Sequence, residues 1–339
     1  MTTQSAAGMP APMRFTVDSW DPAYGSSLEF EDDLSESTAR VIVGAEVPED
    51  QWRPIPAAPA TSGPSALLFV DGVRRIEARV WIDGSPPSPT DPGASAAMCA
   101  SYAAGVLCCC AAGAHLLTTQ TRRGLFTIAP HAADVVTSTG TYRASKTSPS
   151  PAVSLPMTLS AALQRRLGDL ELATAVAARG GLNGHAGPPE SDLLVIDGPL
   201  RGRQHLPRAI GFIKSHRTSY LPPPLHAMVA ALADGERTPV FLMGTSWDRH
   251  AWYLRLPCPP GAPWSGIVRI ECSADLPRAD VITLASMSQA TLCRYASTEY
   301  KDPRAPQNLY PIAGLERELR RRLGDPRLLY RALRSAAVA

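Results

Sequence analysis

Apolar and polar positions follow different periods along the chain, and those of the first half predict strands. An apolar run over 66–70 ends on Asp71 and Gly72, which predicts a short buried strand followed by a turn. From 75 to 82 apolar and polar residues alternate, as in a half-buried strand. Two further apolar segments, 98–110 and 115–128, are separated by Ala-Ala-Gly. These segments together predict an antiparallel meander.

The pattern changes to a helical spacing at Pro156. Leucines recur at that spacing up to Gly180, with Thr158 as the expected N-cap. A short apolar strand over 192–197 then ends on Asp197 and Gly198, and another strand follows over 209–214. The remaining expected elements are helices at 225–233 and 279–296, strands at 239–243, 251–256 and 266–272, and basic helical turns over 315–334 that are broken at Gly324 and Pro326. This order predicts an α/β fold.

Residues 1–64 differ from the rest of the chain. They include an acidic stretch at 29–36 and four prolines between 54 and 64, which disfavour helix and central strand. We expect an irregular N-terminal arm that wraps the core or a partner, followed by one domain over 65–339.

Composition narrows the class of protein. Of 339 residues, 45% are hydrophobic and 19% charged, as in a globular protein, and a net charge of +2 excludes a histone-like polyanion binder while leaving room for a local basic groove. The seven cysteines form no C-x-x-C pair, which favours reduced, buried thiols. No signal peptide is evident, and the uncharged stretch 96–117 is rich in small residues and favours buried strands over a membrane span. We therefore expect a soluble cytoplasmic protein without a membrane segment.

The two strands that end in Asp-Gly carry the candidate chemistry. A strand bearing Asp71, a meander, a helix and a strand bearing Asp197 follow the order of the ribonuclease-H-like fold, a mixed sheet with an antiparallel meander and parallel strands flanked by helices. In that fold the first and fourth core strands are adjacent, so the two acids converge. Close carboxylates repel each other unless a cation lies between them, and oxygen ligands select Mg²⁺ or Mn²⁺. Such ions support phosphodiester hydrolysis.

These strand motifs, together with Glu171 in the helix, Lys214 on the following strand and the segment 306–312, resemble the NurA nuclease family from about residue 65 to the C-terminus. The resemblance implies a Mn²⁺-dependent DNA nuclease, with Mg²⁺ as the alternative ion, that acts in DNA end resection and repair. It implies a homodimer and a HerA-type hexameric ATPase as partner. Asp71, Asp197 and Glu171 match the family's acids and would bind the metal, Lys214 matches a strand lysine, and Tyr310 matches the aromatic residue of the C-terminal motif.

The chain departs from the family pattern at one place, and the identity of the third acid has an alternative. Many archaeal members carry a histidine shortly after the Tyr-Pro of the last motif, where this chain has the sequence Ala-Gly-Leu-Glu over 313–316. Glu316, Asp302 and Gln307 remain open as substitutes. Glu77 is the rival third acid, but its alternation with the neighbouring arginines favours a solvent face.

Two other functions compete with a nuclease. A catalytically weak adaptor that docks on a HerA-type DNA translocase would keep the fold without converging acids. An actin-like ATPase shares the sheet order but would need glycine-rich phosphate loops after both Asp-Gly pairs, and neither 72–75 nor 198–201 provides one. Convergence of the acids in the folded chain discriminates the nuclease from the adaptor.

Overall fold

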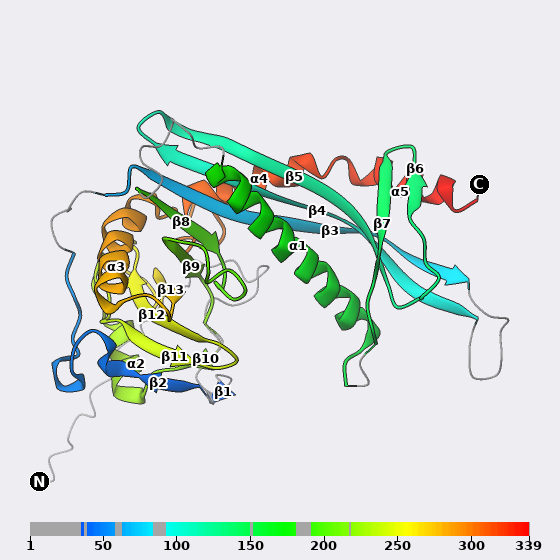
Figure 1. The fold of residues 1–339 in the computed structure, drawn as a ribbon. Coiled ribbons are helices and arrows are strands. Elements are labelled where there is room, and N and C mark those ends of the chain that lie inside the picture. Colours follow the sequence, from blue (N-terminus) through cyan, green and yellow to red (C-terminus); the bar gives the residue numbers. More distant parts are fainter. Residues whose placement is uncertain are drawn as a thin grey trace, which may run out of the picture.

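The computed structural model describes residues 35–36, 39–57, 63–83, 93–149, 152–180, 191–216 and 218–338. In these residues the main feature is an eleven-stranded mixed sheet flanked by helices (Figure 1). From edge to edge its strands are β2 (Arg40–Ile42), β11 (Phe241–Gly244), β12 (Asp248–Arg255), β13 (Ile267–Ser273), β9 (Ala209–Ile213), β8 (Asp192–Asp197), β3 (Ala66–Asp83), β4 (Ala94–Cys110), β5 (Gly113–Thr127), β7 (Gly140–Lys146) and β6 (Val135–Thr137). A separate pair joins β1 (Ser35–Glu36) to β10 (Thr218–Ser219).

The helices are α1 (Leu155–Gly180), α2 (Pro223–Ala230), α3 (Arg278–Leu292), α4 (Tyr310–Arg322) and α5 (Pro326–Ala336). In Figure 1, α1 crosses one face of the long strands β3, β4 and β5, and α4 lies on the opposite face. No helix in the described ranges is both long and apolar enough to span a membrane.

Strand β3 is the axis of the sheet. It pairs antiparallel with β4, which pairs antiparallel with β5, so the predicted meander is present. On its other side β3 pairs parallel with β8, and β8 pairs parallel with β9. The chain is therefore a mixed α/β protein, and the first long strand lies directly beside the strand that follows α1.

The two faces of β3 build two different cores. Leu67 and Phe69 pack in a buried cluster with residues of α3 and the start of α4, whereas Leu68 and Val70 pack with residues of α1. This follows from the period of two along a strand, which sends successive side chains to opposite faces. The same alternation decides which way the residues beyond Val70 point.

Two local expectations are wrong. Asp71 and Gly72 do not end a strand, because the β3–β4 ladder continues through them, with Asp71 paired to Gly105 and Gly72 to Ala104. Thr158 is not an N-cap: α1 begins at Leu155, and the Thr158 hydroxyl donates to the Ser154 carbonyl oxygen at 3.1 Å. A proline is compatible with the first turn of a helix, because its missing N–H group would have no partner within the helix there, so Pro156 permits this earlier start.

Several element boundaries agree with the sequence pattern. Helix α1 ends at Gly180, and the basic C-terminal region is divided between α4 and α5 at Gly324, whose φ of +87° favours glycine. Helix α4 nevertheless begins at Tyr310, several residues before the expected start at 315. A proline again occupies its first turn.

The described part of the first 64 residues packs on the sheet. Strand β2 pairs antiparallel with β11, and Trp52 is buried in a core cluster with Phe241 and Tyr253. Glu46 accepts hydrogen bonds from the buried Arg237 guanidinium at 2.7 and 2.9 Å. Residues 1–34 of the predicted arm lie outside the described residues.

Candidate active site

Asp71 and Asp197 lie side by side on neighbouring parallel strands. The register of β3 and β8 aligns Val70 with Ile196, so the next residue of each strand is the aspartate. Alternation sends both aspartates to the face that carries Leu67, Phe69, Leu193 and Val195. Strand β8 ends at Asp197, where Gly198 adopts a φ of +102° and turns the chain away. The turn expected after Asp197 is therefore present, in contrast to that after Asp71.

Lys214 joins this pair of acids. It follows the last residue of β9, and its Nζ donates to Asp197 Oδ2 at 2.7 Å and to Asn308 Oδ1 at 3.1 Å. Asn308 in turn donates from Nδ2 to Asp302 Oδ2 at 2.6 Å. The buried ammonium group is thus paired with a carboxylate, as its apolar surroundings require. This series of hydrogen bonds from Asp302 through Asn308 holds the Lys214 ammonium group beside Asp197.

The surroundings of Asp71 disfavour its ionised form. Burial raises the pKa of its carboxyl group well above the usual value, and the charge of Asp197 raises it further. The positive charge of Lys214 lowers this pKa, while Glu171 and Glu316 raise it. The side chain accepts a hydrogen bond from the Gly72 amide at 2.7 Å. The site therefore concentrates more negative charge around Asp71 than Lys214 neutralises.

Glu171 lies on α1, at the face of β3 opposite to the one to which Asp71 points, because Gly72 shares the parity of Leu68 and Val70. A Cβ atom on Gly72 would clash with Glu171 Oε1, so the carboxylate rests directly against the β3 backbone at the residue after Asp71. Arg203, on the loop after β8, forms an ion pair with Glu171 and fits in the space left by Gly168. Burial raises the Glu171 pKa to about 7, and Asp197 adds to the rise, whereas Arg203 opposes it. Desolvation thus exceeds the effect of the arginine.

The close contact at Gly72 gives a testable prediction. We expect Gly72→Ala to destabilise the protein by roughly 1–3 kcal/mol, the usual cost of overpacking, because its Cβ would also lie 2.7 Å from Leu167 Cδ1. Urea denaturation measures the effect. Gly314→Ala is the control, since nothing lies within 4 Å of a Cβ there and alanine favours the helix. Equal stabilities for the Gly72→Ala variant and the wild type would contradict the placement of Glu171.

The other predicted residues are placed as follows. Tyr310 begins α4, its hydroxyl lies 2.7 Å from Thr298 Oγ1, and Lys301 lies over its ring, so its contacts in the described chain do not lead to the acids. Glu77 is not on a solvent face: its side chain is 1% exposed and paired with Arg75 at 3.0 Å. A bulge between Ile76 and Ala78 interrupts the alternation on which that expectation depended.

The three candidate substitutes for the absent histidine have different partners in the structure. Glu316 pairs with Arg304 and Arg320, and its charge reaches Asp71. Asp302 acts through Asn308, as described above. Gln307 donates to the Trp264 carbonyl oxygen at 3.2 Å. Glu316 is therefore the only one of the three whose charge acts on the Asp71 carboxyl.

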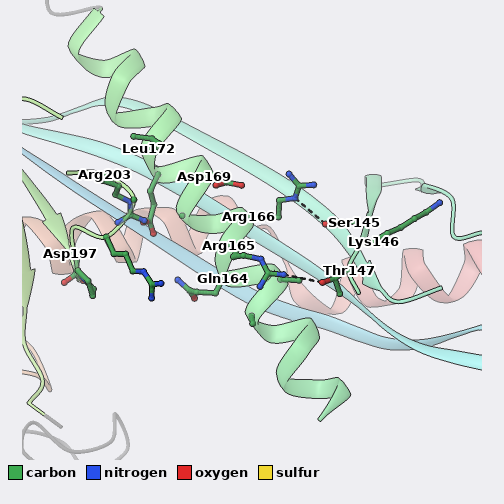
Figure 2. Close-up of a pocket in the computed structure, with 17 residues that line it drawn as sticks. Ser145, Lys146, Thr147, Gln164, Arg165, Arg166, Asp169, Leu172, Asp197 and Arg203 are labelled. Carbon is green, nitrogen blue, oxygen red and sulfur yellow. Dashed lines mark hydrogen bonds and ion pairs between the residues drawn. The ribbon is translucent and has the colours of Figure 1, made fainter. Parts of the chain in front are cut away.

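A basic groove with a volume of about 980 Å³ runs along α1, and of the two strand aspartates it is lined by Asp197 and not by Asp71. Figure 2 shows Asp197 and Arg203 towards one end and Ser145–Thr147 towards the other. Its acidic lining residues are Asp169, Glu171 and Asp197, and its basic ones are Lys146, Arg165, Arg166, Arg201 and Arg203. The guanidinium groups of Arg165 and Arg166 donate to Thr147 Oγ1 and Ser145 Oγ at 3.3 Å each, which orients them along the groove. This wall suits an extended polyanion.

Sequence reasoning missed Asn308 and Arg203. Asn308 lies inside the 306–312 motif, where its amide was available as a signal beside Tyr310. Arg203 lies in a loop after β8 without periodicity, and only the folded chain brings it to Glu171.

The donor set of the acids suits a hard divalent cation. Asp71 and Asp197 supply carboxylate oxygens on one face of adjacent strands, and the Asp71 pKa is raised first by burial and then by the charge of Asp197. Glu171 is held by Arg203. In the described chain, the carboxylate oxygens of Asp71, Asp197 and Glu171 do not all lie within 4.8 Å of one another. Asp71 and Asp197 therefore fit a cation directly, and Glu171 fits as an outer partner. A separate group has its three ligand atoms within 4.8 Å of one another: Cys108, Cys110 and His115.

Neither a protein-family model nor a curated protein matches the chain. Among solved structures the chain is similar to the NurA nuclease from Sulfolobus solfataricus, with 8% identity and a TM-score of 0.40 over 80% of this chain and 84% of that chain. A likeness at this level does not establish family or activity.

Proposed function

We propose that the protein is a metal-dependent nuclease that hydrolyses DNA phosphodiesters at Asp71 and Asp197. The observation that carries this proposal is the alignment of the two acids on adjacent parallel strands, with Lys214 paired to Asp197 and Asp197 at one end of a basic groove. A divalent cation held by these carboxylates would activate water and neutralise charge on the scissile phosphate. The preference for DNA and for Mn²⁺ rests on the resemblance to NurA nucleases.

The chain's own residues have distinct roles in this proposal. Lys214, held by Asp197 and Asn308, offers a positive charge to a phosphate oxygen at the acids. Arg203 holds the Glu171 carboxylate against Gly72 on the α1 face of β3, from where its charge acts on Asp71. Arg165 and Arg166 bind the phosphates that lie further along the strand. Tyr310 acts outside this set, near Thr298 and Lys301.

The strand order supports a ribonuclease-H-like assignment. The central strands run β5-β4-β3-β8-β9, with an antiparallel meander on one side of β3 and parallel strands on the other. Helix α1 connects the meander to β8. The strand that bears the first acid thus lies beside the strand that bears the second, as that fold requires.

A cleavage assay tests the proposed activity. We expect the purified chain to degrade single- or double-stranded DNA in Mn²⁺, with weaker or equal activity in Mg²⁺, and to stop when EDTA removes the ion. A chain that is folded and binds DNA but leaves both substrates intact with either ion would refute the proposal.

The groove gives a separate binding prediction. Neutralising two arginines with the double variant Arg165→Ala/Arg166→Ala should weaken single-stranded DNA binding and reduce the slope of log K against log salt by about 1.4, or 0.7 for each lost phosphate contact. Fluorescence anisotropy at several salt concentrations measures both. The control is Arg327→Ala/Arg331→Ala on α5, where both residues are exposed. Equal losses in the two variants would show that the groove is not the binding path.

The alternative function is a catalytically weak adaptor on a HerA-type DNA translocase. It is favoured by the ion pairs Lys214–Asp197 and Arg203–Glu171, which neutralise two of the three acids. Isothermal titration with Mn²⁺ separates the two: the nuclease binds the ion through Asp71 and the adaptor does not. The homodimer and the HerA-type partner stay predictions, which light scattering of the chain alone and with the ATPase of the same organism would test.

A further inference from the structure

A second group of metal-ligating side chains lies on the β4–β5 hairpin, away from the acids. Cys108 and Cys110 are two residues apart on β4 and therefore point to the same face, which is the face that packs towards α1. His115, on β5, is the direct cross-strand partner of Cys108. Cys109, between the two, points to the opposite core. Two thiols and an imidazole thus meet on one side of the hairpin.

Their ligand atoms all lie within 4.8 Å of one another, the only such group of three among the described His, Cys, Asp and Glu residues. Cys108 is buried, whereas Cys110 and His115 are half-buried, so the group opens towards solvent. His115 Nδ1 lies 3.3 Å from the Gly113 carbonyl oxygen, the kind of contact that fixes the tautomer of a metal-binding histidine. A small approach of the three side chains would reach tetrahedral coordination distances.

The hairpin end pairs with the start of β3, where Ala66 is aligned with both Cys110 and Asp192. The group is therefore at the opposite end of the β3–β8 pair from Asp71 and Asp197.

We propose that Cys108, Cys110 and His115 bind one Zn²⁺ ion at the end of the β4–β5 hairpin. Two thiolates and an imidazole are ligands that select zinc over the hard ions suited to the carboxylates. Binding releases two thiol protons for each ion and leaves the fourth position to water or to a ligand from outside the group. The ion links the last residues of β4 to the first residues of β5 and so stabilises the hairpin end. This site is independent of the proposed nuclease activity.

Cobalt substitution in the full-length, reduced chain tests the site. Co²⁺ held by cysteine gives a thiolate-to-cobalt charge-transfer band, which carboxylate-bound cobalt lacks, so the two sites of this protein are read separately. We expect the band at one equivalent in the wild type and its displacement by Zn²⁺. Cys110→Ser and His115→Gln should lower Zn²⁺ affinity by at least about tenfold, since loss of an outer-shell partner alone reaches that range.

Cys109→Ser is the matched control, because it changes the neighbouring thiol that faces away from the group. It should keep the band, as should Asp71→Asn, in which only the carboxylate site is altered. Zn²⁺ should also raise the melting temperature of the wild type and of Cys109→Ser but not of Cys110→Ser, because an ion that binds the folded state alone stabilises it. Absence of the band in the reduced wild type, or an equal loss in Cys109→Ser, would overturn the proposal. Should Cys108→Ser fail to fold, the half-buried positions Cys110 and His115 carry the test.

Discussion

Asp71→Asn is expected to lower metal-dependent DNA cleavage on the order of 10³-fold or more, since it removes the carboxylate on which the charges of the site converge. Asparagine keeps the shape of the side chain but not its charge. In the metal-free protein the same change should raise the melting temperature, because a buried carboxyl group whose pKa is raised by burial and by Asp197 opposes folding when it is ionised. Activity falls and stability rises in one variant.

Asp83→Asn is the matched control, because Asp83 is the exposed last residue of the same strand. It should leave both cleavage and melting temperature near the wild-type values. Isothermal titration adds a third measurement, in which Mn²⁺ binding is lost in Asp71→Asn and kept in Asp83→Asn. An Asp71→Asn variant that folds and cleaves at the wild-type rate would show that Asp71 does not hold the metal.

The fold was predictable where one periodic signal dominates. The meander and β8 follow from apolar runs and, over 75–82, from alternation, and α1 follows from leucines at helical spacing; tertiary packing did not override these signals. The sequence misled at Asp71 and Gly72, where a pair of residues typical of turns lies inside an 18-residue strand. Gly72 is there because Glu171 and Leu167 pack against its Cα, a requirement that comes from α1 and not from the local chain.

The candidate site divides in the same way. The proximity of Asp71, Asp197 and Lys214 could be predicted because each is the polar residue that follows a buried apolar run. Arg203 and the ligand group on the β4–β5 hairpin could not, because they depend on contacts between segments. In the hairpin, spacing alone hides that Cys108 and Cys110 share a face and that His115 pairs with Cys108 across the turn. The sequence alone therefore predicts reduced, buried thiols.

The stability of the metal-free protein should fall as the pH rises through the range in which Glu171 ionises. Its pKa is raised from 4.5 to about 7 in the folded state, mainly by burial. Between these values the folded chain holds a proton that the unfolded chain has lost, so the free energy of unfolding decreases as the pH rises. The shift corresponds to roughly 3 kcal/mol lost between about pH 4.5 and 7. Mn²⁺ should restore stability above pH 7, because a cation favours the ionised carboxylates of the site.

Urea denaturation in EDTA at a series of pH values measures this loss in the wild type and in Glu171→Gln. The comparison must be between variants, because buried His216, whose pKa is lowered to about 3 mainly by desolvation, makes the whole protein less stable as the pH falls below 6.5. Subtracting the Glu171→Gln profile removes that contribution and leaves the fall assigned to Glu171. Asp169→Asn, an exposed acid on the same helix, should keep the wild-type profile. Parallel profiles for the wild type and Glu171→Gln would mean that Arg203 neutralises Glu171 completely and that burial does not raise its pKa.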